Sequence, residues 1–147
     1  MASTQTRRYA PMNARIQTNV TPQYADVPRM VAALLESTKH LQEMLRLWSQ
    51  RQVSENQVSH VYIRLGGEFN ATVTAFQYYN IDLSDLYSTP EELRIVLEAI
   101  LSEVASPQVL AIHQPRVRQI IYNLLQGLRS KQPAYWRAVG SSHAYMS

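Results

Sequence analysis

A basic and aromatic run in the last third of the chain holds the side chains best suited to chemistry. No acid follows Glu103, and the run comprises Arg116, Arg118, Tyr122, Arg129, Lys131, Tyr135, Trp136 and Arg137. Cationic side chains pair with carboxylates and phosphates, and aromatic rings stack on bases or anchor protein interfaces. The run therefore predicts contact with an acidic protein, an anionic membrane or nucleic acid, unless it is only the solvated side of an amphipathic helix.

Catalytic and metal-binding patterns are weak by comparison. The four histidines, at positions 40, 60, 113 and 143, form no HxxxH or HExxH pair, and the chain has no cysteine. Such spacing does not suit zinc. The adjacent Glu91 and Glu92 would point apart on a helix, and the sequence has no nucleophile elbow and no phosphate-binding loop. We therefore predict no enzymatic activity, cofactor or metal, although residues distant in sequence could still meet in a fold.

Length and composition are those of one globular domain. The chain has 147 residues, of which 46% are hydrophobic, and this composition argues against general disorder. No apolar run is long enough to span a membrane, and the N-terminus lacks the apolar segment of a secretory signal. Together with the absence of cysteine, these features lead us to expect a cytoplasmic protein.

The charges are unevenly distributed along the chain, although the net charge is only +3. Residues 1–25 contain Arg7, Arg8 and Arg15 and no acid, whereas residues 82–103 contain six acids against the single Arg94. Blocks of this kind create a field across the molecule and favour an acidic partner at its basic end.

The longest helical pattern runs from Ser54 to Asn80. Ser54 and Gln57 have the spacing of a capping box, which marks a helix start. Apolar residues then recur every three or four positions, at Val58, Tyr62, Leu65, Phe69, Val73 and Phe76. Other helices must cover so wide an apolar stripe. We therefore expect this to be the central helix, with Leu65, Phe69 and Phe76 in the core.

Gly66 and Gly67 interrupt the central helix pattern. Each glycine costs a helix interior about 1 kcal/mol relative to alanine, so the pair needs a reason. Close approach of a neighbouring helix or a local kink would explain it, and so would an exposed notch for a partner. A phosphate loop is the weakest alternative, because the spaced glycines and the following Lys-Ser/Thr are missing.

Caps and prolines predict the later helices. The sequence Thr-Pro-Glu-Glu from Thr89 is typical of a helix start, with Thr89 as the cap. A shorter helix should begin at Ser106 and stop before Pro115, since proline lacks a backbone N–H donor. The last long helix should run from Pro115 until Pro133 breaks or bends it.

The remaining segments complete an all-α prediction. A helix is expected from residue 26 to about residue 51, joined by a short turn to the central helix as an antiparallel pair. Residues 80–88 should form a loop whose apolar members, Ile81, Leu83 and Leu86, plug the bundle. The domain is then an antiparallel helical bundle of about four to five helices over residues 26–139, with a flexible basic arm (1–25) and a loose tail (140–147).

Several segments of the sequence resemble one known family. VYIRLGGEFN, followed by AF and then DLSDL, is similar to the N-terminal domain of the fungal bud-site-selection, actin-interacting proteins, which are formin cofactors of cell polarity. LLESTKHLQEMLRLWSQ and PRVRQIIYNLLQGLRSKQPAYW extend the resemblance over about residues 31–139. The resemblance implies an actin- and formin-binding region in the C-terminal part of family members, and we expect this chain to lack that region.

The resemblance implies a targeting role. It suggests a non-enzymatic interaction module that helps place a regulator of the actin and microtubule cytoskeleton at the cell cortex, at bud tips, bud necks or hyphal tips. The partners it implies are cortical polarity or cytoskeletal proteins, including microtubule-associated ones, or an anionic membrane surface. A basic helical nucleic-acid-binding domain is the alternative, motivated by the acid-free C-terminal third. Wide apolar stripes also leave a homo-oligomer open.

We predict that a partner binds the basic C-terminal helix and the turn after it. With the apolar side of this helix committed to the core, the charges should point outward and the aromatic residues should serve as anchors. The predicted binding residues are Arg118, Arg129, Lys131, Tyr135, Trp136 and Arg137, with the Gly66-Gly67 notch as a second location.

Overall fold

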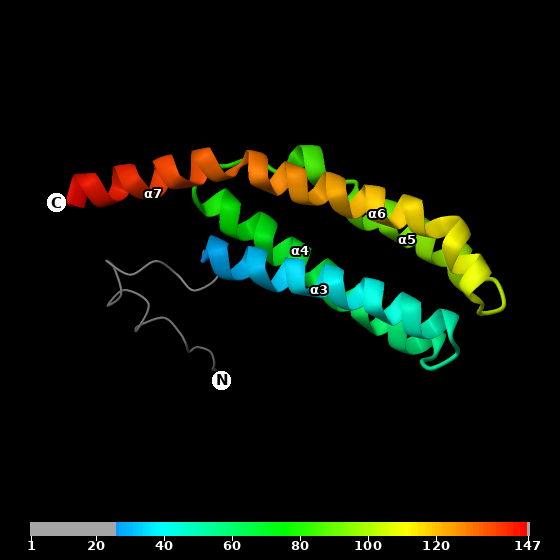
Figure 1. Cartoon of the computed structure of the whole chain (residues 1–147). Helices are drawn as coiled ribbons and strands as arrows, with labels where there is room; N and C mark the ends of the chain where they lie inside the picture. Colours follow the sequence, from blue (N-terminus) through cyan, green and yellow to red (C-terminus); the bar gives the residue numbers. More distant parts are fainter. Residues whose placement is uncertain (1–25, 147) are drawn as a thin grey trace, which may run out of the picture.

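The computed structural model describes residues 26–146, and these form an all-α fold (Figure 1). The elements are α3 (Val27–Ser49), α4 (Glu55–Tyr78), the 3₁₀ helix η2 (Ser84–Leu86), α5 (Thr89–Leu101), α6 (Pro107–Ser130) and α7 (Gln132–Met146). No strand occurs in this part of the chain. The predicted all-α helical bundle is therefore confirmed, whereas the predicted arm over residues 1–25 lies outside the described residues.

Two antiparallel hairpins make up the bundle. α3 pairs with α4, α5 pairs with α6, and the two hairpins lie side by side with their turns at the same end (Figure 1). The turns touch, because the Arg51 Nε–H donates to the Ala105 carbonyl at 3.3 Å. α7 continues beyond α6 at the opposite end, where α3 begins.

Caps define the starts of α3 and α4 as the sequence predicts. The Asp26 carboxylate accepts from the Arg29 N–H at 3.2 Å. At α4 both bonds of the capping box are present: the Ser54 hydroxyl accepts from the Gln57 N–H at 3.2 Å, and the Gln57 side chain accepts from the Ser54 N–H at 2.8 Å. These contacts satisfy N–H groups that a helix start would otherwise leave unpaired.

The predicted cap of α5 is wrong by one residue. Ser88 occupies the cap position, and Thr89 is already helical and buried. The Ser88 hydroxyl accepts from no backbone N–H of α5; it instead donates to the Glu92 carboxylate at 2.6 Å. Because the Thr89 side chain is only 5% exposed and faces the interior, it is not placed to cap the helix from outside.

α4 supplies the centre of the core. Leu65, Phe69 and Phe76 are at most 3% exposed, which confirms the predicted central helix, and Trp48 of α3 is buried as well. Buried polar groups on α4 find partners: the Thr72 hydroxyl donates to the Glu68 carbonyl at 2.8 Å. A side-chain hydrogen bond from Ser37 to Glu68 joins α3 to α4.

α6 is one continuous helix, whereas the sequence predicts two helices separated at Pro115, and this prediction is wrong. It continues through Pro115, and its buried residues lie on both sides of the proline, at Leu110, Val117, Ile120, Ile121, Leu124 and Leu128. A proline here leaves the Ala111 carbonyl without its helical donor. Both Ala111 and Pro115 are exposed, so water can hydrate that carbonyl while the opposite side stays packed. Tertiary burial therefore overrides the local helix-stop signal.

The loop between α4 and α5 behaves as predicted. Ile81, Leu83 and Leu86 are buried, while the aspartates between them are exposed. Leu86 packs so closely on α6 that a Cβ at Gly127 would overlap it. The loop thereby closes the end of the bundle on which α6 finishes.

A break between α6 and α7 confirms the predicted effect of Pro133. α6 ends at Ser130, Lys131 caps it, and Pro133 sits in the first turn of α7. α7 then runs to Met146, past Gly140, from where the sequence analysis expected a loose tail.

Candidate interaction surface

The basic residues predicted to bind a partner fall into two groups. Arg118, Arg129 and Arg137 are exposed, and their guanidinium groups make no ion pair with the described residues. Lys131 differs: its Nζ pairs with the Asp85 carboxylate at 3.0 Å, and its side chain is only 21% exposed. The expectation that Lys131 points freely outward is therefore wrong. The loop before α5 brings Asp85 to the end of α6, a contact that sequence spacing cannot reveal.

Arg116 also forms an ion pair within the domain. Its guanidinium contacts the Glu92 carboxylate on α5 at 3.2 Å. Exposed ion pairs of this kind contribute little to stability, but they lower the charge that a partner would meet. The net positive charge of α6 and α7 thus resides in Arg118, Arg129 and Arg137, which we call the free arginines.

The predicted aromatic anchors also differ from each other. Tyr135 is half-buried, with its ring 5.3 Å from that of Tyr79 and 5.1 Å from that of Trp136, both in edge-to-face geometry. Burial raises the pKa of the Tyr135 phenol. Trp136 is 59% exposed. Tyr135 therefore packs α7 against the bundle, whereas Trp136 presents its ring to solvent.

A groove lies beside these residues, between the start of α3 and the junction of α6 with α7. Its volume is about 420 Å³, and its walls include Val31, Leu35, Leu125, Arg129, Tyr135 and Trp136. We call it the α3–α7 groove. Its wall is mostly apolar, and Arg129 is its charged member. Such a site suits an apolar side chain next to a carboxylate.

The α3 side of this groove is formed by apolar residues of the first predicted helix. Val31 and Leu35 are half-buried, because no other helix covers them completely. Their apolar side chains predict burial, but the sequence does not show that this burial is only partial. The position of α7 determines which apolar residues of α3 stay accessible.

Gly66 and Gly67 lie apart from this groove and line no part of it. α4 remains helical through both, and a Cβ added at either position would meet nothing within 4 Å. The explanation by close approach of a neighbouring helix is therefore wrong within the described residues. Space for a Cβ is open at both glycines, and a notch for a partner stays a prediction.

Replacing either glycine by alanine is expected to stabilise the domain. Gly66→Ala and Gly67→Ala should each raise the free energy of unfolding by about 1 kcal/mol, because alanine loses less backbone entropy in a helix. Denaturant unfolding followed by circular dichroism measures the change. Gly127→Ala is the contrasting variant, since its new methyl group would overlap Leu86 and should cancel or reverse the gain. Destabilisation by Gly66→Ala would mean that a neighbour covers this side of α4.

The side chains described, those of residues 26–140, offer no other kind of site. No three of His, Cys, Asp or Glu gather among them as a metal site would require. None of the described helices combines the length and the apolar composition needed to cross a membrane.

Comparison with known protein families gives a match over most of the described chain. The family model for the Aip3p/Bud6 N-terminal domain matches residues 28–136, which run from the start of α3 to Trp136 and include both hairpins. No curated protein and no solved structure matches the chain. The matched span is well over half of the chain and contains all the segments on which the resemblance was based. The chain belongs to the Aip3p/Bud6 N-terminal domain family, a family of actin-interacting proteins of cell polarity.

Proposed function

We propose that this domain is a non-enzymatic targeting module that helps to place a cytoskeletal regulator at the cell cortex. The observation that carries the proposal is the α3–α7 groove, where Arg129 lies with the exposed Trp136, and Arg118 and Arg137 are the further free arginines of α6 and α7. Charge and an accessible aromatic ring in one place are typical of a protein-binding surface. Family membership supports a role in polarity, and the surface suggests how that role is performed.

The partner we propose is an acidic surface. Arg118, Arg129 and Arg137 can attract carboxylates from a distance, and Trp136 can bury apolar area once contact is made. Cortical polarity proteins and cytoskeletal proteins with acidic segments fit this description, and an anionic membrane would satisfy the charges without filling the groove. Binding at bud tips, bud necks or hyphal tips would follow from where such a partner is concentrated.

Charge reversal of the free arginines tests this proposal. The triple variant Arg118→Glu, Arg129→Glu and Arg137→Glu should keep its melting temperature nearly unchanged, because these side chains are exposed and form no ion pair with the residues that the structure describes. It should lose concentration at growth sites when followed by fluorescence in budding or hyphal cells. The physical reason is that the proposed acidic partner would then face six more units of negative charge, counting two for each reversal.

A matched pair of single variants separates position from net charge. Arg129→Glu should weaken localisation, whereas Lys39→Glu, an equal charge change at an exposed position on α3, should not. If the folded triple variant still concentrates at growth sites like the parent, α6 and α7 are not the targeting surface. Binding of duplex DNA with a steep dependence on salt would instead favour the nucleic-acid alternative.

A further inference from the structure

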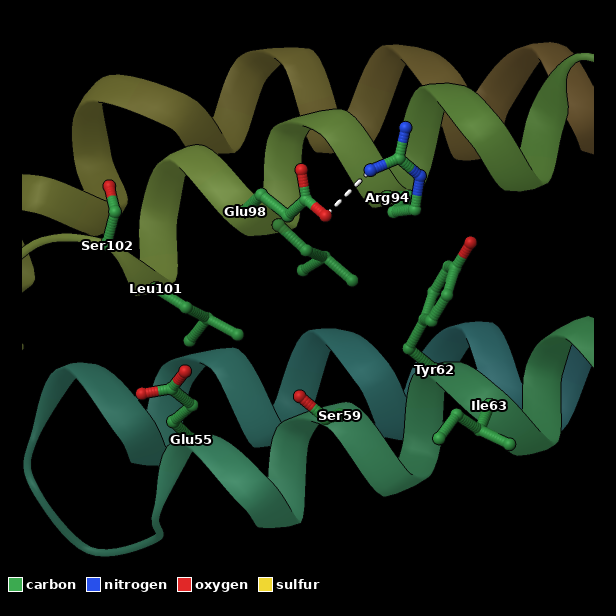
Figure 2. A pocket seen from close by; sticks show the side chains of 9 residues that line it. Glu55, Ser59, Tyr62, Ile63, Arg94, Glu98, Leu101 and Ser102 are labelled. Atoms are coloured by element: carbon green, nitrogen blue, oxygen red, sulfur yellow. Dashed lines mark hydrogen bonds and ion pairs between the residues drawn. The ribbon is translucent and has the colours of Figure 1, made fainter.

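A second groove lies on a different side of the bundle, between the first half of α4 and α5 (Figure 2). It has a volume of about 380 Å³, and the side chains of the two helices face each other across it. Its apolar walls include Tyr62, Ile63, Leu97 and Leu101, and its polar rim includes Glu55 and Glu98. We call it the α4–α5 groove.

This groove has a fixed floor and an uncovered edge. The Tyr62 hydroxyl donates to the Pro90 carbonyl at 2.7 Å, which ties α4 to the first turn of α5. Leu97 is 5% exposed and forms part of the packed floor. Ile63, in contrast, is 66% exposed on the edge, with no element of the described chain covering it. The groove therefore offers apolar surface on a preformed support.

The charge at the groove is negative. Arg94 is held on both sides by the carboxylates of Glu91 and Glu98, the second at 2.7 Å, and these hydrogen bonds raise its pKa. Its positive charge is thus already balanced. Glu55 makes no ion pair within the described residues, so the three carboxylates outnumber the one guanidinium. A cationic segment complements such a surface, and an acidic one is repelled.

The uncovered glycines continue the same face of α4. Gly66 is four residues beyond Tyr62 and three beyond Ile63, and Gly67 is four beyond Ile63, so helical spacing places them next along the groove. A Cβ at either position would contact nothing. The domain itself therefore gains no packing from these glycines. Glycine on a helix surface lets a second backbone come closer than any side chain would allow.

We propose that the α4–α5 groove and the Gly66-Gly67 notch together bind a basic amphipathic helix of a partner protein. Apolar side chains of that helix pack on Ile63 and Leu101, and its lysines or arginines pair with Glu55 and Glu98. The backbone of its far end crosses the glycines. From Glu55 to Gly67 the site is about 18 Å long, which corresponds to roughly three turns of a helix.

This inference does not depend on the proposed function of α6 and α7. The two surfaces have opposite charge and lie on different helices, so each can be tested with the other intact. The α4–α5 groove adds a binding site for a cationic partner to a module whose other surface suits an anionic one.

A designed peptide provides the probe. We would use a fluorescent synthetic helix of about fourteen residues, with leucine and alanine on one face and lysine on the other, and measure its binding to the full chain by anisotropy. The same peptide with glutamate in place of lysine is the charge control. The lysine peptide should bind, and the glutamate peptide should bind at least about tenfold more weakly.

Matched variants locate the bound peptide. Ile63→Ser should weaken binding at least about tenfold, while Ile112→Ser should leave it unchanged. Ile112 is 73% exposed and lies on α6 outside the groove, so the two substitutions remove similar exposed side chains. Equal effects of the two variants, or none, would overturn the proposal.

The variant Gly67→Ala distinguishes a loss of binding from a loss of folding. This variant should melt at a higher temperature than the parent yet bind the lysine peptide more weakly, because the new methyl group blocks close approach. Unchanged binding by Gly67→Ala would remove the notch from the site and overturn the proposal as stated. Dimerisation that Ile63→Ser abolishes, without any peptide binding, would also overturn it and assign the groove to a second copy of the chain.

Discussion

Replacing Phe69 with alanine is expected to lower the free energy of unfolding by about 3–5 kcal/mol. Phe69 is 3% exposed in the middle of α4, among the buried side chains that hold the hairpins together. Truncation removes most of its buried apolar area and leaves a cavity that rigid helices cannot close. Small domains have a total stability of about 5–15 kcal/mol, so this single change consumes a large part of it. Urea unfolding followed by circular dichroism provides the measurement.

Ile63→Ala is the control for this experiment. Ile63 lies on the same helix but is 66% exposed, so its truncation should cost well under 1.5 kcal/mol, which is about the lower limit for a fully buried side chain. If Phe69→Ala costs no more than Ile63→Ala, α4 does not form the centre of the core.

The substitution Pro115→Ala is expected to stabilise the domain by about 2 kcal/mol. An interior proline costs a helix about 3 kcal/mol, because it deletes one hydrogen bond and crowds the preceding turn. Alanine would restore a donor for the Ala111 carbonyl. Part of the gain is lost because proline also restricts the unfolded chain, an effect of about 0.4–1 kcal/mol. The expected outcome is a higher melting temperature with unchanged helical signal or a slightly larger one.

Pro107→Ala distinguishes a helix-interior effect from a general effect of removing proline. Pro107 is the first residue of α6, where a backbone N–H has no helical partner in any case. This variant should therefore change stability little, or lower it slightly. Similar results for the two prolines would mean that α6 is interrupted at Pro115, which is what the sequence alone predicts.

Sequence reasoning succeeded where the determining contacts are local. The capping box of Ser54 and Gln57 and the regular apolar stripe of α4 lie within one helix, so their spacing is enough to predict it. It failed at Pro115, because packing on both sides of the proline, which the local sequence does not contain, keeps α6 continuous. Burial on one side of a long helix can outweigh a single local stop signal.

The candidate surface was predictable in composition but not in detail. A run of arginines and aromatic residues is visible in the sequence, yet Lys131 pairs with Asp85, which is distant along the chain. The half-covered Val31 and Leu35 are likewise ordinary apolar residues until α7 is placed beside them. The tertiary structure determines which charged side chains lack an ion pair and which apolar side chains remain accessible to solvent.

The position of both hairpin turns at one end of the bundle has a mechanical consequence. Val27 at the start of α3 and Gln132 at the start of α7 line the same groove, so chain segments on either side of the bundle attach close together at the opposite end. Tension between those segments would separate the helices starting from the end opposite the turns, so that their contacts break one after another. Helices loaded from opposite ends must instead slide past each other and break all contacts at once. The bundle should therefore yield to a small pulling force, and the α3–α7 groove would be the first part to open.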